Sequence, residues 1–278
     1  MKHFIVYSSP SGSTRHIAEM IYKRLIQQGC AAALWDLGKG AERQNIARSL
    51  REVDEPLCLW IGSPVYVDHA VPPVEAFLDD LPPLKEAAGV PFVTWGAVSS
   101  GVALLEMGRK MKEKGLVLLG GAKIVALHSF MWKCQEPLGA GHPSPEDAEA
   151  VEALVDKVLA KLSAGDMAPL SLSVLDYLPP ERKKAAEGKS ILKLKKLHPE
   201  FAFDASRCTQ CGVCREACPA DAVSLDPYPR VSDSCFLCGT CARLCPEDAV
   251  VLDLSSLEEY LPSMARKNDE KPLTEIFF

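Results

Sequence analysis

The chain has 278 residues, of which 47% are hydrophobic and 24% charged, and its formal charge is -6. This length allows one large domain or one medium-sized domain with a small partner, and the apolar content supports a real core, which excludes a disordered chain. The longest largely apolar stretch, residues 116–132, is interrupted by two glycines, a lysine and a histidine, so we expect no membrane span. The four apolar residues at positions 4–7 are too few for a secretory signal, and we therefore expect a cytoplasmic protein.

The first half of the chain alternates short apolar runs with amphipathic stretches, which is the rhythm of β-α-β units. In chain order, these are strand-like 4–7, helix-like 17–25, strand-like 31–35 and 57–61, helix-like 74–81, strand-like 90–95, helix-like 102–114, strand-like 116–127 and helix-like 146–162. The last strand-like run is broken at Gly120 and Gly121. Five strands with helices between them predict an α/β domain with a doubly wound parallel sheet over residues 1–165.

The periodicity weakens in residues 166–200, where prolines and a glycine interrupt it and seven basic side chains gather. We interpret this segment as a linker with some helix, and its lysines as a solvated charged face. Residues 201–278 hold 13 acidic against 7 basic side chains, which gives no indication of nucleic-acid binding. A basic surface on a partner or on the linker is the expected complement to this acidic region.

Cysteines divide the chain in two, because eight of the eleven fall between positions 208 and 245. A reducing compartment makes disulfides a poor explanation for them. They form two copies of one pattern, 27 residues apart: Cys208, Cys211, Cys214 and Cys218 with Pro219, then Cys235, Cys238, Cys241 and Cys245 with Pro246. A β-like run follows each copy, at 222–225 and at 249–252, so residues 201–254 form a pseudo-twofold unit.

The spacing Cys-x2-Cys-x2-Cys-x3-Cys-Pro, present twice, resembles that of bacterial two-cluster ferredoxins. The resemblance implies a small α+β domain that holds two [4Fe-4S] clusters. It also implies the ligands: a first cluster site of Cys208, Cys211, Cys214 and Cys245, and a second cluster site of Cys235, Cys238, Cys241 and Cys218. Structural zinc is the alternative, but a zinc ribbon uses two cysteine pairs and has no need of the third cysteine in each copy.

A hydroxyl-rich turn, residues 9–14, joins the first predicted strand to the first predicted helix. Hydroxyls and backbone N–H groups at a helix N-terminus suit an anion, although serine and threonine are also ordinary helix caps. The turn matches the [ST]-x-[ST]-G-x-T loop of flavodoxins, and with the five-strand rhythm the first 165 residues resemble the flavodoxin-like fold. The resemblance implies that the phosphate of FMN is held by Ser9, Ser11, Gly12, Ser13 and Thr14.

Two further segments resemble the loops that flank the isoalloxazine ring in that family, residues 62–66 after the third strand and residues 95–101 after the fourth. In such a sheet these loops meet at the carboxyl edge, where ligands bind. The resemblance implies flavin contacts from Pro64, Val65, Tyr66, Gly96, Ala97, Ser99 and Gly101. Tyr66 is the main stacking candidate, because we expect Trp95 to lie in the strand and the rest of the second loop has no aromatic residue, which could leave one flavin face open. His69 and His128, at the ends of predicted strands, are candidate proton donors near a flavin.

The whole chain resembles the flavodoxin-ferredoxin fusion proteins of anaerobic microbes. The resemblance implies an oxidoreductase that transfers electrons between two [4Fe-4S] clusters and FMN, with a redox partner protein or a small-molecule acceptor. The alternative is a ferredoxin-type carrier whose first domain lacks flavin and serves for partner docking. No motif identifies a catalytic residue. The tail, residues 255–278, is expected either to pack back on the large domain or to meet a second subunit of a homodimer.

Overall fold

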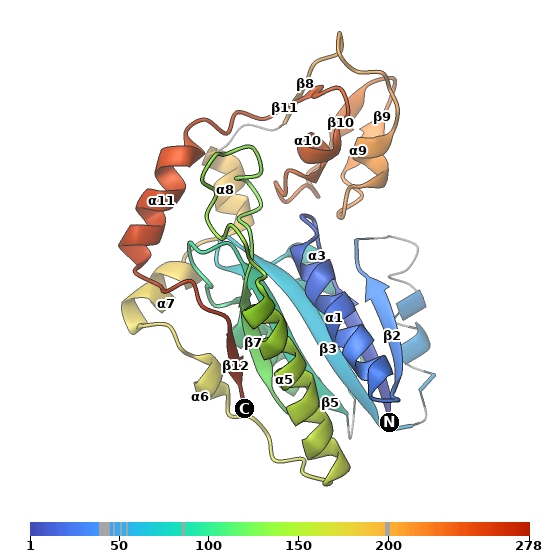
Figure 1. The fold of residues 1–278 in the computed structure, drawn as a ribbon. Helices are drawn as coiled ribbons and strands as arrows, with labels where there is room; N and C mark the ends of the chain where they lie inside the picture. The colour runs from blue at the N-terminus through green and yellow to red at the C-terminus, as the bar shows by residue number, and fades with distance from the viewer. Residues whose placement is uncertain (39–44, 47, 51, 54, 85–86, 198–200) are drawn as a thin grey trace.

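The computed structural model describes residues 1–278 except 39–44, 47, 51, 54, 85–86 and 198–200 (Figure 1). Its main sheet has the strand order β12-β7-β5-β3-β1-β2. The parallel strands of this sheet are β1 (Lys2–Tyr7), β2 (Ala31–Asp36), β3 (Leu57–Tyr66), β5 (Ala88–Trp95) and β7 (Gly121–Val125), with the short β6 (Val117–Leu118) also paired to β5. Numbered in chain order, the five parallel positions lie 2-1-3-4-5, the order of flavodoxin-like folds, which confirms the predicted fold class.

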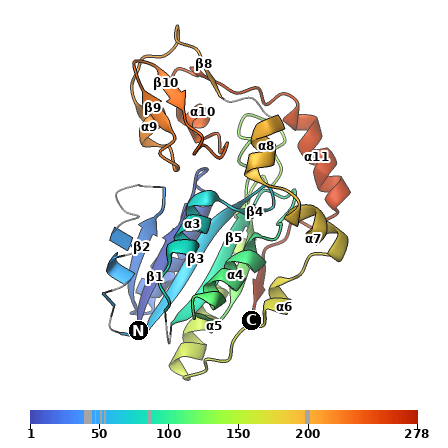
Figure 2. The same cartoon turned by 180° about the vertical axis from the view of Figure 1, so that it is seen from behind.

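Helices cover both faces of the sheet. One face carries α1 (Ser13–Gln27) and α5 (Pro145–Ser163), and the other carries α3 (Pro72–Asp80) and α4 (Ala103–Glu113) (Figures 1 and 2). Side chains alternate along β1, so that Phe4 and Val6 enter one apolar core while Ile5 and Tyr7 enter the other. None of the described helices is long and apolar enough to cross a membrane.

Residues 62–66, which we expected to form a loop, are the last five residues of β3. The strand stays paired with β5 as far as Pro64, and the chain then turns back through Val67 and Asp68 into β4 (His69–Ala70). The turn residues have φ of 53° and 70°. Gly62 belongs to the strand because a Cβ there would lie 2.2 Å from the ring of Phe92, so this glycine marks close packing and no turn.

The linker, between the sheet domain and the cysteine-rich segment, contains three short helices. They are α6 (Leu172–Leu175), α7 (Pro180–Glu187) and α8 (Ile191–Leu197). It packs firmly against the sheet domain, since Leu170 and Leu175 are buried in one of its cores. Its basic side chains are not all solvated: Lys189 pairs with Asp68, Arg182 with Glu270, and Lys195 donates to the carbonyl of Asp233. Of these three contacts, only the ion pair of Arg182 with Glu270 joins a basic linker side chain to a carboxylate of residues 201–278, as expected.

The cysteine-rich segment is a small α+β unit, which we call the cluster module (residues 201–254). Its elements are β8 (Ala202–Phe203), α9 (Val213–Glu216), β9 (Val223–Leu225), β10 (Pro229–Val231), α10 (Thr240–Leu244) and β11 (Val250–Val251). They form two two-stranded sheets, β10-β9 and β11-β8. The 27-residue repeat of the sequence recurs in the backbone, where positive φ values occur at Gln210 and Leu237, Gly212 and Gly239, and Asp221 and Asp248.

The tail returns to the large domain, which is one of the two expected outcomes. Helix α11 (Leu257–Asn268) runs from the cluster module down to the sheet, and β12 (Glu275–Phe277) then pairs antiparallel with β7 (Figure 1). The sheet therefore has an antiparallel edge strand, β12, that the sequence did not indicate. Self-association of the chain remains a prediction.

Candidate functional site

The eight motif cysteines separate into two groups in space. Cys208, Cys211, Cys214 and Cys245 line one cavity of the cluster module. In the other group, burial and then the neighbouring sulfurs of Cys218 and Cys235 raise the pKa of the Cys238 thiol to about 11, and burial and then the sulfurs of Cys238, Cys235 and Cys218 raise the pKa of the Cys241 thiol. Each group thus takes three cysteines from one copy of the repeat and the fourth from the other.

Backbone amides point at several of these sulfurs. Ala222 donates its N–H to Cys218 Sγ and Ala249 donates to Cys245 Sγ, both at 3.2 Å, and these two contacts are again one repeat apart. Such amide hydrogen bonds stabilise thiolate ligands and help to set a cluster's reduction potential.

The hydroxyl-rich turn wraps the N-terminus of α1. Gly12 has a φ of 96°, and a Cβ at this position would meet nothing within 4 Å. Ser9 Oγ accepts from the amide of Arg15 at 2.9 Å, while in the described part of the chain the amides of Ser11, Gly12 and Ser13 donate to no acceptor. Ser8 Oγ, fully buried one residue before the turn, also has no hydrogen-bond partner among the described residues. Free amides and hydroxyls at a helix N-terminus are a donor set that fits a phosphate.

The cluster module lies directly on this turn. Thr240 Oγ1, on α10, donates to the carbonyl of Pro10 at 3.0 Å, and Arg243 Nη1 donates to the carbonyl of Ser11 at 2.9 Å. The second guanidinium nitrogen of Arg243 also donates to Pro10. Because α10 holds the carbonyl side of the turn, the amide side stays available. The second cluster site, which includes Cys241 on the same helix, therefore adjoins the predicted phosphate site.

A cavity of about 190 Å³, which we call the ring cavity, lies at the carboxyl edge of the sheet. Seven of the predicted flavin contacts line it: Ser11, Ser13, Pro64, Val65, Tyr66, Gly96 and Ser99. Ser9 and Gly12 line a neighbouring cavity beneath α10. Thr14, Ala97 and Gly101 line neither; Thr14 is buried and shares a 2.8 Å hydrogen bond with Thr94. Gly101 has a packing role, since a Cβ there would lie 2.1 Å from the carbonyl oxygen of Asp68.

The tail supplies one wall of the ring cavity, which sequence reasoning missed. Tyr260, Leu261, Met264 and Asn268 of α11 all line it. Asn268 Nδ2 donates to the carbonyl of Val98 at 2.8 Å and so fixes the helix to the loop after β5. Tyr260 thereby places an aromatic ring beside a loop that has none of its own. No local signal in the sequence indicates a contact between segments so far apart.

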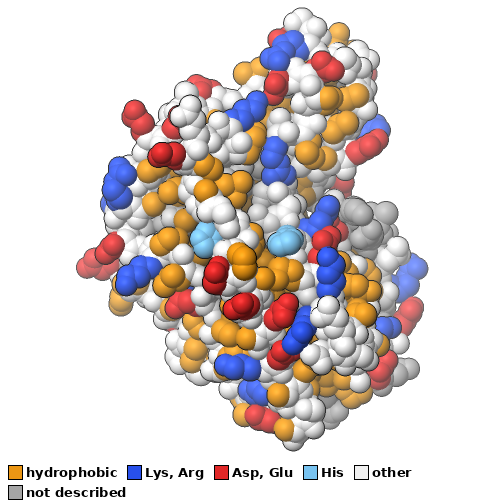
Figure 3. Space-filling view, viewed as in Figure 1, with side chains coloured by type: hydrophobic (Ala, Val, Ile, Leu, Met, Phe, Trp, Pro, Cys, Tyr) orange, Lys and Arg blue, Asp and Glu red, His pale blue; other side chains and the backbone are white. Residues whose placement is uncertain are grey.

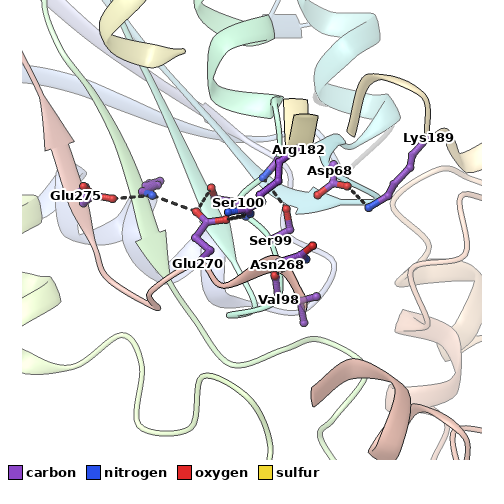
Figure 4. Close-up of polar contacts among 11 residues, drawn as sticks. Asp68, Val98, Ser99, Ser100, Arg182, Lys189, Asn268, Glu270 and Glu275 are labelled. Carbon is purple, nitrogen blue, oxygen red and sulfur yellow. Dashed lines mark hydrogen bonds and ion pairs between the residues drawn. The ribbon is translucent and has the colours of Figure 1, made fainter. Parts of the chain in front are cut away.

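A buried polar network holds the loops of the ring cavity in place (Figure 4). The carboxylate of Glu270, 8% exposed, accepts from Ser100 N at 3.1 Å, Lys123 Nζ at 3.1 Å and Arg182 Nη2 at 2.6 Å. Burial alone raises a carboxyl pKa, but here the hydrogen bonds from Ser100 and the charge of Lys123 hold the pKa of Glu270 below its usual value. The loop after β5 is thus joined to both the linker and the tail.

The two candidate histidines have different environments. His69 lies outside the ring cavity: its Nδ1 is 2.9 Å from Glu106 Oε2, and its Nε2 is 3.1 Å from the carbonyl of Ala186. The Glu106 hydrogen bond raises the pKa of His69, which indicates an anchor for the linker. His128 does line the ring cavity, and burial lowers its pKa to about 4, so its ring is neutral near pH 7.

Comparisons with known proteins distinguish the cysteine-rich segment from the rest of the chain. Residues 201–224 and 232–248 each match a family model described as a 4Fe-4S binding domain. No curated protein matches the chain.

Among solved structures, the chain is similar to rubredoxin oxygen:oxidoreductase from Desulfovibrio gigas, with 18% identity, a TM-score of 0.47, and coverage of 59% of this chain and 36% of that one. The chain therefore spans about a third of that protein's length. It is also similar to a flavodoxin from the domain Archaea (22% identity, TM-score 0.45, 59% of this chain and 99% of that one) and to oxidised Flavodoxin 2 from Bacillus cereus (22%, 0.44, 58% and 99%). The chain joins a sheet of flavodoxin strand order to two 4Fe-4S binding segments, which is the arrangement of a flavodoxin-ferredoxin fusion.

Proposed function

We propose that the protein is an iron-sulfur flavoprotein that moves electrons between two [4Fe-4S] clusters in the cluster module and an FMN at the ring cavity. The eight motif cysteines are the cluster ligands, divided as the first and second cluster sites. FMN, when bound, takes up electrons singly and can deliver two together. The outer partners are a redox protein at the clusters and a small molecule or protein at the flavin.

The contact between α10 and the hydroxyl-rich turn carries this proposal. Thr240 lies two residues after Cys238 and donates to Pro10, so a second-site ligand and the phosphate turn are joined through one side chain. The rings of Phe236 and Tyr66 are 6.2 Å apart, which brings the same cysteine loop beside the predicted stacking residue. A docking domain without flavin would not need its phosphate turn and stacking residue to face a cluster.

The residues of the flavin site support FMN through their donor set. The phosphate would meet the free amides of residues 11–13, with Ser9 and Ser11 hydroxyls beside them. Tyr66 and Tyr260 border the ring cavity and offer aromatic surface to a planar ligand. Neutral His128 borders the ring cavity without adding charge to it.

Anaerobic purification followed by iron, sulfide and flavin analysis tests the proposal. We expect about eight irons per chain, as two cubane clusters require, and one FMN released by heat. Protein with the same iron content that takes up no FMN from solution would refute the flavin part and leave the ferredoxin-type carrier. Colourless protein with stoichiometric zinc would refute both.

A further inference from the structure

A second cavity, of about 270 Å³, lies beside the ring cavity where five parts of the chain converge. We call it the junction cavity. Its walls come from the end of β3, the loop after β7, helix α8, the Phe236–Leu237 part of the second cysteine loop, and the start of the tail. Hydrophobic and histidine side chains gather across the middle of the molecule on the face drawn in Figure 3, below the cluster module. Tyr66 and Tyr260 line both cavities, so the two share a boundary.

The lining of the junction cavity selects against charge. Among the described residues that line it there is no lysine or arginine, and the single carboxylate is Asp253. An anionic ligand would lose its hydration and meet no cation, which is costly in an apolar site. Five aromatic rings border the space, those of Tyr66, Phe130, Phe201, Phe236 and Tyr260. Aromatic walls favour a flat ring system over a flexible chain.

His128, which lines the junction cavity, carries a hydrogen-bond donor whose position on the ring can be assigned. The amide of Phe130 donates to His128 Nδ1 at 3.3 Å, so in the neutral imidazole the proton lies on Nε2. No hydrogen bond joins Nε2 to the described residues, although His128 lines both cavities. A neutral ring with a free N–H suits an uncharged acceptor such as a carbonyl oxygen.

We propose that the junction cavity is a binding site for a neutral, planar, largely apolar carbonyl compound of the quinone class, held by a hydrogen bond from His128 Nε2. The role of this compound as an electron acceptor rests on the proposed function above. In the proposed reaction, the bound quinone is reduced by two electrons and two protons, and its two carbonyls become two hydroxyls. The electrons come from a low-potential one-electron donor by way of the clusters and FMN, and the protons come from water.

Binding can be tested without turnover, using cluster-loaded protein and the ketone 9-fluorenone as a planar, neutral probe. Equilibrium dialysis should show one bound equivalent, and 9-oxofluorene-2-carboxylate, which differs by one anionic group, should bind at least about tenfold more weakly because its charge is left unpaired. Equal binding of the two compounds would refute a charge-selective apolar site.

Matched variants locate the probe. Leu194→Trp fills the junction cavity from α8, while Leu192→Trp on the same helix places the same ring at a position that is 72% exposed. We expect the first variant to abolish fluorenone binding and the second to leave it unchanged, both with full iron content. His128→Phe should weaken binding by about tenfold, since one hydrogen bond is lost, and His128→Gln should restore part of it. Equal behaviour of the two tryptophan variants would place the probe elsewhere.

The two proposals can fail separately. Protein that binds fluorenone but no FMN would support the junction cavity and refute the flavin relay. Protein that binds FMN but no fluorenone would support the flavin site and refute the junction cavity as a binding site. Mutual displacement of FMN and fluorenone would show that the two cavities form one flavin site, and it would overturn the separate acceptor site.

Discussion

Arg243 Nη1 lies 2.9 Å from the backbone carbonyl oxygen of Ser11, which joins the second cysteine repeat to the predicted phosphate turn across 232 positions of sequence. Arg243 is desolvated enough that burial lowers its pKa, and its other guanidinium nitrogen donates to Pro10. The side chain thus fixes two consecutive carbonyls on the outer side of the turn. The amides on the inner side keep their orientation only if these carbonyls keep theirs, because each peptide unit is planar.

Replacing Arg243 should therefore weaken FMN binding without removing a cluster. We expect Arg243→Ala to raise the Kd for FMN by about tenfold, since hydrogen bonds from a charged group are worth about 1.5–3 kcal/mol and part of that loss reaches the turn. Quenching of flavin fluorescence during titration measures the Kd, and iron analysis confirms the clusters. Arg215→Ala is the control, because Arg215 is exposed on α9 of the other repeat. A normal Kd in Arg243→Ala would show that the turn holds its shape alone.

The two cysteine repeats should differ in their effect on flavin. Cys211 and Cys238 occupy the same place in the two copies, but Cys211 is exposed and Cys238 lies two residues before Thr240. We expect Cys211→Ala to remove about four irons and leave FMN affinity intact, and Cys238→Ala to remove a similar number and weaken FMN binding. The measurements are iron per chain and the Kd for FMN. If both variants bound FMN equally well, the contact through α10 would have no influence on the flavin site.

A charge at the phosphate turn should expel FMN and spare the clusters. In Gly12→Asp the new carboxylate has open space around it, so repulsion of the phosphate is the main effect, with some strain from the positive φ. Gly165→Asp is a matched control, because Gly165 also has a positive φ and open space but lies far from the turn, after α5. Flavin content and iron content are measured side by side. Full flavin content in Gly12→Asp would show that the phosphate lies elsewhere.

The sequence was enough to predict the sheet and the cysteine repeat, and the structure shows why. Phe4, Ile5 and Val6 are all apolar because successive side chains of this strand point into two different cores, so a short apolar run indicates a buried strand. The spacing of the cysteines is set by the positions that cluster ligands must occupy. What it missed depends on contacts between distant segments. Tyr260 in the ring cavity and β12 at the sheet edge belong to a tail that was expected to pack on the large domain or on a second subunit, but its local sequence does not show which segments it contacts. The error at residues 62–66 has the opposite cause, since a Gly-Ser-Pro run that is typical of turns is used here for close packing in a strand.

Acid should destabilise the sheet domain through His3. This side chain is 1% exposed, accepts a hydrogen bond from Trp60 Nε1 at 3.2 Å, and has its pKa lowered by burial from 6.5 to about 4. Between these two pH values the unfolded chain binds a proton that the folded chain does not, so stability falls as the pH drops from 6.5 towards 4. From pH 7 to 5 this amounts to about 2 kcal/mol. Denaturant unfolding of His3→Gln at both pH values should show a drop smaller by that amount, and an unchanged drop would exclude His3 as the cause.

The tail should depend on Glu270 far more than on Glu275, although both pair with Lys123. Glu270 is 8% exposed and also accepts from Arg182 and Ser100, whereas the Glu275 side chain is 49% exposed. Neutralising one partner of a buried ion network costs about 3–5 kcal/mol, and an exposed pair contributes about 0–1 kcal/mol. We therefore expect Glu270→Gln to release the tail, so that limited proteolysis cuts near α11, while Glu275→Gln resists cleavage like the unmodified chain.

The same release should occur in the unmodified chain on acidification. Folding lowers the pKa of Glu270, so the contribution of this carboxylate to stability is lost as the pH falls through that pKa. Equal cleavage of the two variants would mean that the pairing of β12 with β7, and not this network, holds the tail in place.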